Sequence, residues 1–314
     1  METNNKCRLV TRSDFDGLVC AVLLKDLNII DDILFVHPKD MQDGLIDITG
    51  RDITTNLPYV EAAHLVFDHH SSELIRLQSQ SHPNYIINPD APSAARVVYE
   101  YYGGEQKFPY ISKDMMIAVD KADSAQYDMD DVLRPKDWAL LNFIMDARTG
   151  LGRFRVFRIS NYSLMMSLID SCTKMPIDQI LDLPDVKERT NLYFEHEEEF
   201  KEQLRRCSTV NGDVVSIDLR HEELIHPGNR FMIYSLRPEC NISIHVIWGV
   251  HRRNTVLTVG KSIFNRSSKV NIGEWMLEYG GGGHANAGTC QVPNDQADRV
   301  LAELIKRINA VKAE

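Results

Sequence analysis

A chain of 314 residues with 43% hydrophobic and 25% charged side chains has the composition of a folded protein, which excludes extended disorder. Its length exceeds what one ordinary hydrophobic core organises and predicts two domains. A formal net charge of −10 argues against broad binding of duplex nucleic acid, because that binding needs a basic surface.

The start of the sequence, METNNKCRLV, is polar and lacks the apolar core of a signal peptide. No uncharged apolar run reaches the length of about 18 residues that a membrane span needs. We therefore expect a cytoplasmic protein without a membrane segment. The cysteines are scattered without a CxxC pair, which predicts reduced, buried thiols instead of disulfides or a zinc site.

The first half of the chain alternates between strand and helix patterns. Residues 7–11 predict a strand that ends in an acidic turn, and residues 18–27 predict the helix that follows. Further strands are expected over 33–36 and 64–67, and further helices over 93–102, 115–121 and 138–147. This alternation predicts an α/β domain whose mainly parallel sheet is flanked by helices.

The second half begins with a polar-faced helical pattern over residues 186–206, which predicts a linker helix. We interpret its acidic run over 195–199 as a solvated face. The pattern beyond it favours a smaller C-terminal α/β domain with a mixed sheet. Its strands are expected over 214–218, 231–235, 242–248 and 255–259, and its helices over 272–278 and 295–311.

The first acidic motif, Asp14 and Asp16, follows the strand predicted over residues 7–11. Ligands bind at the carboxyl ends of the strands in open parallel sheets, so two carboxylates that emerge there are well placed to hold a hard cation. An N-cap for the helix that begins near Gly17 is the structural alternative, and it would use one of the two carboxylates.

The tripeptide Asp68-His69-His70 follows the strand predicted over residues 64–67, which places it at the same edge of the sheet. Imidazole together with carboxylate suits Mn²⁺, Fe²⁺ or Zn²⁺, and a carboxylate commonly orients a ligating histidine. Surface histidines ahead of a capped helix are the alternative. We predict a metal site that includes this turn, because packing alone does not explain two adjacent imidazoles at a strand end.

The segment YGGGGHANAGTC over residues 279–290 places four glycines directly before His284. A backbone without side chains can approach a ligand closely and offer N–H donors to phosphate oxygens. His284 can hydrogen-bond a phosphate or a nucleotide. A turn between a helix that ends near Glu278 and a strand over 289–292 is the alternative.

In order and spacing, these motifs resemble those of the DHH phosphoesterase family with its DHH-associated C-terminal domain. The resemblance covers nearly the whole chain and rests on Asp14-Phe15-Asp16-Gly17, Phe67-Asp68-His69-His70, Asp123-Ser124-Ala125-Gln126-Tyr127 and Gly280-Gly281-Gly282-Gly283-His284. It implies a DHH catalytic domain over residues 1–185, a linker helix over 186–209 and a DHH-associated substrate-binding domain over 210–314.

The resemblance also implies two divalent ions, with Mn²⁺ as the expected metal and Mg²⁺ or another divalent ion as the alternative. The implied metal ligands are Asp14 for one ion, Asp16, His69 and Asp123 for the other, and Asp52 as a bridge between both. Asp47 is the alternative to Asp52, and Asp120 is the alternative to Asp123.

The same resemblance gives the remaining site residues their expected roles. His70 would face the phosphate as a catalytic group, and Asp68 would orient a histidine. Arg266 belongs to a segment, residues 262–268, that resembles the family's Arg-Ser element, and its planar fork suits a terminal phosphate. The substrate-binding residues expected beside it are Gly281, Gly282, Gly283 and His284.

Two positions depart from the family's pattern. Many members place a histidine four residues before the first aspartate, where this chain has Val10. Others place an aspartate two residues before it, where this chain has Arg12. The ion beside Asp14 is therefore expected to have fewer protein ligands.

The implied activity is hydrolysis of short oligoribonucleotides or nucleotide phosphates by two-metal activation of water. An exopolyphosphatase is one alternative, because a glycine-rich phosphate cradle needs no base. A nucleotide-binding regulatory protein with weakened catalysis is the alternative from another class, and Val10 motivates it. The acidic charge and the absence of a basic stripe disfavour long duplex nucleic acid as a partner, and a homodimer is compatible with a chain of this size.

Overall fold

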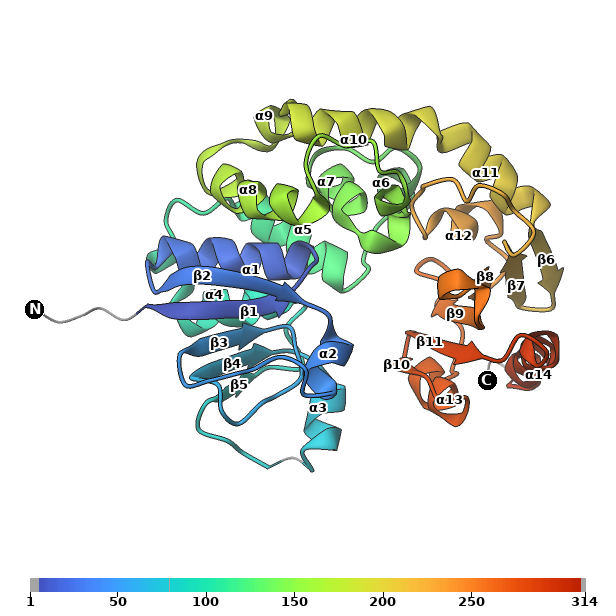
Figure 1. The fold of residues 1–314 in the computed structure, drawn as a ribbon, viewed down its shortest axis with the longest axis horizontal. Coiled ribbons are helices and arrows are strands. Elements are labelled where there is room, and N and C mark those ends of the chain that lie inside the picture. Colours follow the sequence, from blue (N-terminus) through green and yellow to red (C-terminus); the bar gives the residue numbers. More distant parts are fainter. Residues whose placement is uncertain (1–5, 79, 312–314) are drawn as a thin grey trace, which may run out of the picture. The chain divides into compact units, whose positions relative to one another are not determined.

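The structure is a computed structural model that describes residues 6–78 and 80–311. The chain divides into two compact units (Figure 1). The first unit comprises Met1–Gln126, Lys136–Ala147 and Leu151–Asn191. The second unit comprises Tyr127–Pro135, Arg148–Gly150 and Leu192–Glu314.

The first unit is built on a five-stranded sheet whose pairs are all parallel. Its order is β2-β1-β3-β4-β5, and its strands are β1 (Cys7–Arg12), β2 (Ile30–Val36), β3 (Asp52–Thr55), β4 (Leu65–Asp68) and β5 (Tyr85–Ile87). The predicted parallel sheet flanked by helices is confirmed. Strands β3 and β5 were not predicted from the sequence, because each is very short.

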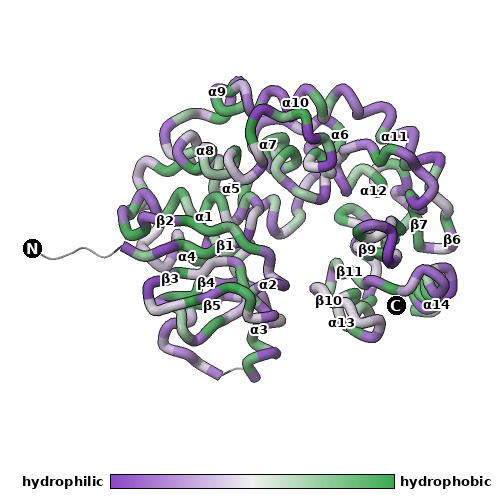
Figure 2. Tube along the Cα trace, in the orientation of Figure 1, coloured by the Kyte–Doolittle hydropathy of each residue, from purple (hydrophilic) through white to green (hydrophobic). Residues whose placement is uncertain are grey.

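Helix α1 (Phe15–Asp26) is the central helix of this unit. Its residues from Phe15 to Leu24 are all buried, as an almost entirely apolar helix requires (Figure 2). It packs against α4 (Ala94–Tyr101), α5 (Lys113–Asp123) and α8 (Asn161–Lys174). The other helices of the chain up to residue 181 are α2 (Pro38–Gln42), α3 (Ser71–Arg76), α6 (Met129–Leu133), α7 (Asp137–Met145) and α9 (Ile177–Leu181), and of these α6 belongs to the second unit.

The segment predicted as one linker helix forms two consecutive helices, α10 (Pro184–Glu195) and α11 (Glu197–Arg206). They meet at His196, which is the N-cap residue of α11. The charge-rich sequence of this segment carries no breaker such as proline or glycine, so composition alone did not indicate the break.

The second unit is built on a mixed six-stranded sheet of order β10-β11-β9-β8-β7-β6. Its strands are β6 (Ser208–Asn211), β7 (Val214–Asp218), β8 (Ile242–Trp248), β9 (Thr255–Lys261), β10 (Gly282–His284) and β11 (Ala287–Val292). Strands β7 and β8 pair in parallel, and the other pairs are antiparallel. Helices α13 (Ile272–Glu278) and α14 (Ala297–Ala310) share a hydrophobic core with the sheet, which confirms the predicted mixed α/β domain.

One predicted strand of this unit is wrong. Residues 231–235 lie almost entirely in a short helix, α12 (Met232–Leu236), whose Met232, Ile233 and Tyr234 are buried. A short apolar run is compatible with a buried strand and with a buried helix, and periodicity does not separate the two.

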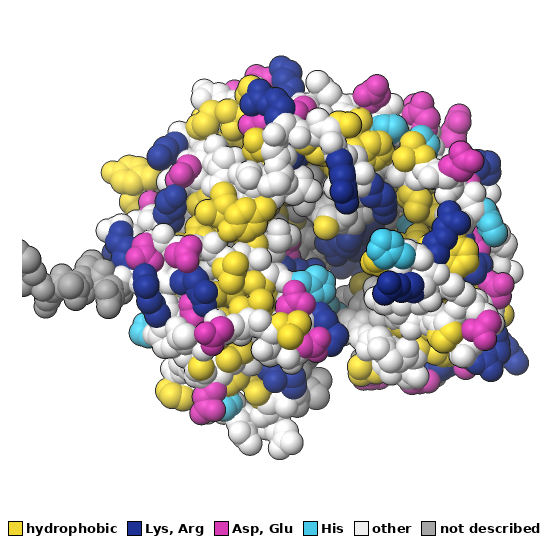
Figure 3. Space-filling model, in the orientation of Figure 1, with side chains coloured by type: hydrophobic (Ala, Val, Ile, Leu, Met, Phe, Trp, Pro, Cys, Tyr) yellow, Lys and Arg dark blue, Asp and Glu magenta, His cyan; other side chains and the backbone are white. Residues whose placement is uncertain are grey.

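Two observations bear on what the surface can contact. Figure 3 shows acidic and basic side chains interspersed over the visible face of each unit. Within residues 6–78 and 80–311, no helix combines the length and apolarity that crossing a membrane requires.

Candidate active site

The carboxyl ends of β1, β3 and β4 meet at one edge of the first sheet. Strands β1 and β3 run parallel with Thr11 opposite Thr55, and β3 and β4 run parallel with Thr55 opposite Phe67. The residues that follow each strand therefore emerge side by side, which is where open parallel sheets bind ligands. This edge carries the Asp14–Gly17 turn and the Asp-His-His turn.

The turn after β1 is fixed by the contacts of Asp14 and Gly17. Asp14 Oδ1 accepts the Gly17 N–H at 3.0 Å and so caps α1, as the structural alternative expected for one of the two aspartates. Its Oδ2 lies 2.9 Å from Arg12 Nε in an ion pair. A Cβ on Gly17 would lie 2.0 Å from the Arg12 carbonyl oxygen, so only glycine lets α1 start this close to β1.

Asp16 is buried and points into the interior of the same edge. Its two carboxylate oxygens accept the N–H groups of Ala94 at 3.0 Å and Ala95 at 2.8 Å, at the start of α4. Burial and, after it, the negative charge of Asp123 raise the pKa of Asp16 well above its ordinary value. Because burial and a neighbouring negative charge disfavour the ionised form of Asp16, a nearby cation would stabilise that form.

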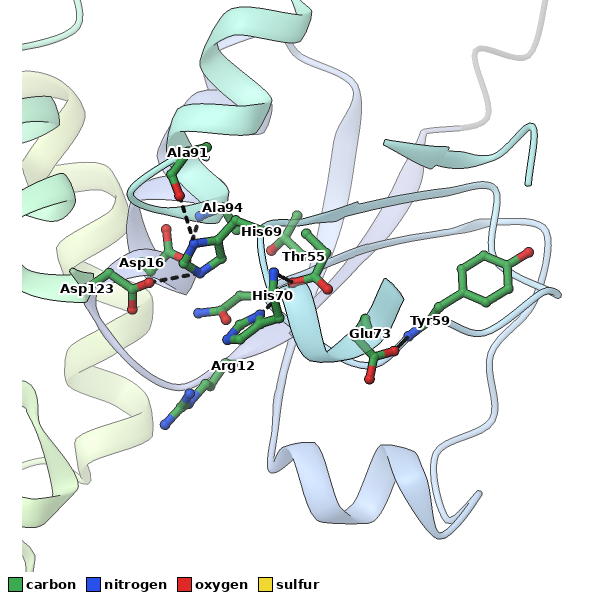
Figure 4. A network of polar contacts seen from close by, with 12 residues as sticks. Arg12, Asp16, Thr55, Tyr59, His69, His70, Glu73, Ala91, Ala94 and Asp123 are labelled. Carbon is green, nitrogen blue, oxygen red and sulfur yellow. Dashed lines mark hydrogen bonds and ion pairs between the residues drawn. The ribbon is translucent and has the colours of Figure 1, made fainter. Parts of the chain in front are cut away.

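His69 faces Asp123 through one ring nitrogen and the backbone through the other. Its Nδ1 lies 3.1 Å from the Ala91 carbonyl oxygen, and its Nε2 lies 2.9 Å from Asp123 Oδ2 (Figure 4). Burial lowers the pKa of His69, but the contact with Asp123 and the charges of Asp123 and Asp16 outweigh burial and raise it to about 9.

Asp123 is the last residue of α5, where a carboxylate opposes the helix dipole. Burial opposes its ionisation, but His69 and, more weakly, His70 and Arg12 outweigh burial and hold the pKa of Asp123 below its ordinary value. Asp120, the alternative from sequence, is engaged elsewhere: it accepts from Ser93 Oγ at 2.7 Å and pairs with Arg96. Of the two aspartates, the structure brings Asp123 to the cluster.

Ligand atoms of Asp16, His69 and Asp123 all lie within 4.8 Å of one another. The Ala91 carbonyl oxygen accepts the Nδ1–H of His69, so Nε2 of the neutral ring carries a lone pair. This lone pair faces an Asp123 carboxylate oxygen 2.9 Å away. Because the two would repel each other, a proton or a cation must lie between them. Two ligands at right angles, each about 2.1 Å from one ion, are about 3 Å apart. One imidazole and two carboxylates therefore fit a divalent metal ion such as Mn²⁺.

Sequence analysis missed Asn56, which follows β3 directly at this edge. Its backbone is left-handed, with φ of 55°, and its side chain is buried. The amide Nδ2 lies 3.5 Å from Asp14 Oδ1, and among the described residues Oδ1 has no hydrogen-bond partner. A buried amide oxygen of this kind is a fourth candidate ligand atom. Its position directly after a strand was the available signal, but no strand had been predicted there.

Asp52, expected to bridge two ions, is at the opposite end of β3 and does not join the cluster. It is the first residue of the strand, opposite Arg8 at the start of β1. Arg8 Nε lies 2.7 Å from Asp52 Oδ1, and the Thr49 N–H donates to Oδ2 at 2.7 Å. Asp47, its alternative, lies at the same end, where its carbonyl oxygen accepts from Arg8. Neither carboxylate is placed to contact a metal held by Asp16.

His70 is held by Asp68, and its ring packs edge-on against the ring of His69, with ring centroids 4.5 Å apart. Its Nδ1 lies 2.6 Å from the buried Asp68 Oδ1, and Tyr85 donates its hydroxyl to Asp68 Oδ2 at 3.0 Å. Burial and the Asp68 charge raise the pKa of Tyr85, so this hydroxyl stays a donor. The structure thus gives Asp68 an orienting contact with His70, whereas His69 is oriented by a backbone carbonyl.

In the second unit the glycine run forms β10, which pairs with β11. A Cβ on Gly281 would lie 2.1 Å from the Thr289 carbonyl oxygen, and one on Gly283 would lie 2.3 Å from that of Ala287. At Gly282, among the described residues, only Leu277 comes within 4.0 Å of the corresponding Cβ position. His284 ends β10 and is exposed. Packing therefore requires Gly281 and Gly283 whatever the segment binds.

Arg266, the other substrate-binding candidate, is exposed and donates Nε to the Ile263 carbonyl oxygen at 2.9 Å. This contact fixes one edge of the guanidinium. The structure places Arg266 between β9 and α13, in the same unit as the glycine segment.

A parallel sheet that ends in an Asp-His-His turn, beside a buried carboxylate and imidazole cluster, defines a phosphoesterase of the DHH type. Residues 229–311 match the family model of the DHHA1 domain. The structure is similar to that of the pGpG-specific phosphodiesterase PggH from Vibrio cholerae, with 63% sequence identity, a TM-score of 0.83, and coverage of 98% of this chain and 100% of that chain. The chain therefore belongs to the DHH family of phosphoesterases.

More distant solved structures are similar over nearly all of this chain. RecJ from Thermus thermophilus, in complex with Mn²⁺, has 13% identity and a TM-score of 0.45, with coverage of 98% of this chain and 52% of that chain. CDC45 from Entamoeba histolytica has 8% identity and a TM-score of 0.47, with coverage of 96% and 95%. No curated protein sequence matches the chain.

Proposed function

We propose that this chain is a metal-dependent phosphodiesterase that hydrolyses a short linear dinucleotide such as pGpG to two mononucleotides. The observation that carries the substrate is the 63% identity, over both full chains, to a phosphodiesterase described as specific for pGpG. The Asp16, His69 and Asp123 cluster supports the metal dependence, because it fits a divalent cation. We propose Mn²⁺ as that cation.

Asp16, His69 and Asp123 would hold the metal, with the Asn56 amide oxygen as a further ligand. When bound, a divalent ion supplies positive charge to the phosphoryl oxygens and lowers the pKa of a bound water. Ala91 keeps His69 in the tautomer that presents Nε2 to the metal, by accepting its Nδ1–H. The start of α4 fixes both Asp16 oxygens, so the cluster is organised before any ligand arrives.

His70 is the residue that we assign to the phosphate. Because Asp68 takes its Nδ1–H, the Nε2 edge of the ring is directed away from Asp68, and in the protonated form that edge donates a hydrogen bond. In the reaction, water adds to the phosphorus and the bond to the 3′ oxygen breaks. The leaving oxygen takes a proton, so one dinucleotide and one water give two nucleoside 5′-monophosphates.

The second unit carries the candidates for binding the rest of the substrate. We assign a terminal phosphate to Arg266, whose guanidinium is suited to bidentate contact. The Gly282 and Gly283 backbone and His284 are the further candidates, because β10 is an edge strand with a short, glycine-rich surface.

The test is turnover with Mn²⁺ on a substrate panel, measured by chromatography of the products. The panel contains pGpG, a longer oligoribonucleotide, a cyclic dinucleotide, a nucleoside 3′,5′-bisphosphate and inorganic polyphosphate, with EDTA and the His69→Ala variant as controls. We expect GMP from pGpG at the highest kcat/KM and none in either control. Preferred hydrolysis of polyphosphate, or nucleotide binding without turnover of any substrate, would contradict the proposal.

A further inference from the structure

We propose that this active site holds one divalent cation, and that the guanidinium of Arg12 supplies the second positive charge beside it. The inference rests on the proposed phosphodiesterase function only for the role of Arg12 toward the substrate. It departs from the two ions that the family resemblance implies, because the residues around Asp14 do not fit a second ion.

The carboxylate of Asp14 is already engaged on both oxygens. Oδ1 caps α1 through the Gly17 N–H at 3.0 Å, and Oδ2 is 2.9 Å from Arg12 Nε. The ion pair neutralises the charge that would attract a cation. Asp14 is also absent from the group of side chains whose ligand atoms converge, which among the described residues consists of Asp16, His69 and Asp123.

The neighbouring strand positions offer no replacement for the missing ligands. Val10 lies in β1 with a fully buried, apolar side chain, and Asn56, directly after β3, carries a neutral amide. Asp52, the expected bridge, is neutralised by Arg8 at the other end of the sheet. A second divalent ion would therefore meet one carboxylate that is already paired. Asp16 and Asp123, whose ligand atoms converge with that of His69, instead supply two negative charges, which match the charge of one divalent ion.

Arg12 lies where its guanidinium can supply the positive charge that a second ion would otherwise supply. It follows the last core residues of β1, so its backbone is fixed by the sheet, and its side chain is one-third exposed. The ion pair with Asp14 is made through Nε, and the two terminal nitrogens form the outer edge of the guanidinium. Figure 4 shows Arg12 on the His70 side of the cluster, the side opposite Ala91. A planar guanidinium there suits two phosphate oxygens.

The first experiment counts metal ions without substrate. Mn²⁺ binding to the metal-free protein is measured by titration calorimetry, and Mn²⁺ retained after gel filtration is measured by mass spectrometry. We expect one ion per chain in the wild type and in Asp14→Asn, and none in Asp123→Asn. Two ions per chain in the wild type, one of which is lost in Asp14→Asn, would overturn the proposal.

A double variant that adds metal ligands tests the same inference by creating a second metal site. Arg12→Asp combined with Asn56→Asp adds two carboxylates beside Asp14 and removes its guanidinium partner. We expect this double variant to bind two Mn²⁺ ions per chain, while Asn56→Asp alone, which keeps Arg12, binds one. Two ions in Asn56→Asp alone would show that Arg12 does not occupy the place of an ion.

The role of Arg12 toward phosphate is tested by measuring hydrolysis of bis(p-nitrophenyl) phosphate by Arg12→Ala and Arg12→Lys. Hydrolysis of this phosphodiester does not require that the protein recognises pGpG. We expect kcat/KM to fall about 100-fold or more in Arg12→Ala, and less in Arg12→Lys, which keeps the charge, with one Mn²⁺ ion in both. Unchanged kcat/KM in Arg12→Ala would overturn this role. Hydrolysis of this diester without hydrolysis of pGpG would refute only the proposed substrate.

Discussion

The affinity for Mn²⁺ should depend steeply on pH, because the contacts that build the site also hold a proton on it. In the metal-free protein the Asp123 contact raises the pKa of His69 to about 9, while metal binding requires the deprotonated ring. At pH 7 about one molecule in a hundred has this nitrogen available, which corresponds to about 2.7 kcal/mol of binding free energy. The dissociation constant should fall about 50-fold between pH 7 and pH 9, and about 100-fold in all as it levels off above pH 9.

The assay is calorimetric titration of the metal-free protein with Mn²⁺ between pH 6.5 and 9.5. At pH 7 it is repeated in buffers of different ionisation enthalpy, which should report release of about one proton per ion. A matched control is Asp120→Asn, which leaves His69 and Asp123 in contact and should keep the pH dependence. A dissociation constant that is the same at pH 7 and pH 9, with no proton release, would refute the reasoning.

The stability of the metal-free protein should change in the opposite direction over the same range. A folded-state pKa raised above the unfolded value gives His69 a stabilising contribution that is complete below pH 6.5 and is lost as pH rises through about 9. The raised pKa of the buried Asp16 has the same sign, because its stabilising contribution is complete below the unfolded pKa of 3.8 and is lost as pH rises through its folded pKa. Thermal melting in EDTA should therefore show a falling Tm between pH 7 and pH 9.

Three further predictions follow from the positions of individual residues. Asp123→Asn should abolish the retention of Mn²⁺, measured by mass spectrometry. Asp120→Asn should still bind Mn²⁺ but should be less stable in urea unfolding, because Arg96 loses its ion-pair partner. Asp52→Asn should cost about 1–3 kcal/mol in urea unfolding, through the loss of a charged hydrogen bond, with unchanged Mn²⁺ content; loss of the metal would contradict its placement. Gly281→Ala should lower the free energy of unfolding by about 1–3 kcal/mol, because the new Cβ would lie 2.1 Å from the Thr289 carbonyl oxygen. Gly282→Ala should leave the free energy of unfolding nearly unchanged. Equal effects of the two substitutions would refute this account.

The order of elements was predictable where the local pattern is strong. The strand of residues 7–11 and the helix after it have an apolar run, an acidic turn and a second apolar run, and the structure shows β1 and α1 there. Strand β3 was missed, because four residues with the sequence DITT carry too little pattern. Without this strand, the sequence did not show that Asp52 is its first residue and lies away from the carboxyl edge, where Asn56 follows the last residue of the strand.

The sequence by itself determined the chemistry available at the site. The Asp14–Gly17 turn and the Asp68-His69-His70 turn each follow an apolar strand, and parallel strands necessarily bring such turns to one edge. The sequence therefore carried the α/β fold, the family and most of the cluster.

Only the tertiary structure decided which carboxylates share a point in space. Asp120 and Asp123 lie one helical turn apart, and packing of α5 directs one to Arg96 and the other to His69. Arg12 and Asp14 are close in sequence, but spacing does not report their ion pair. Ligand geometry depends on ångström distances between side chains from different elements, and those distances are set by how the helices pack on the sheet.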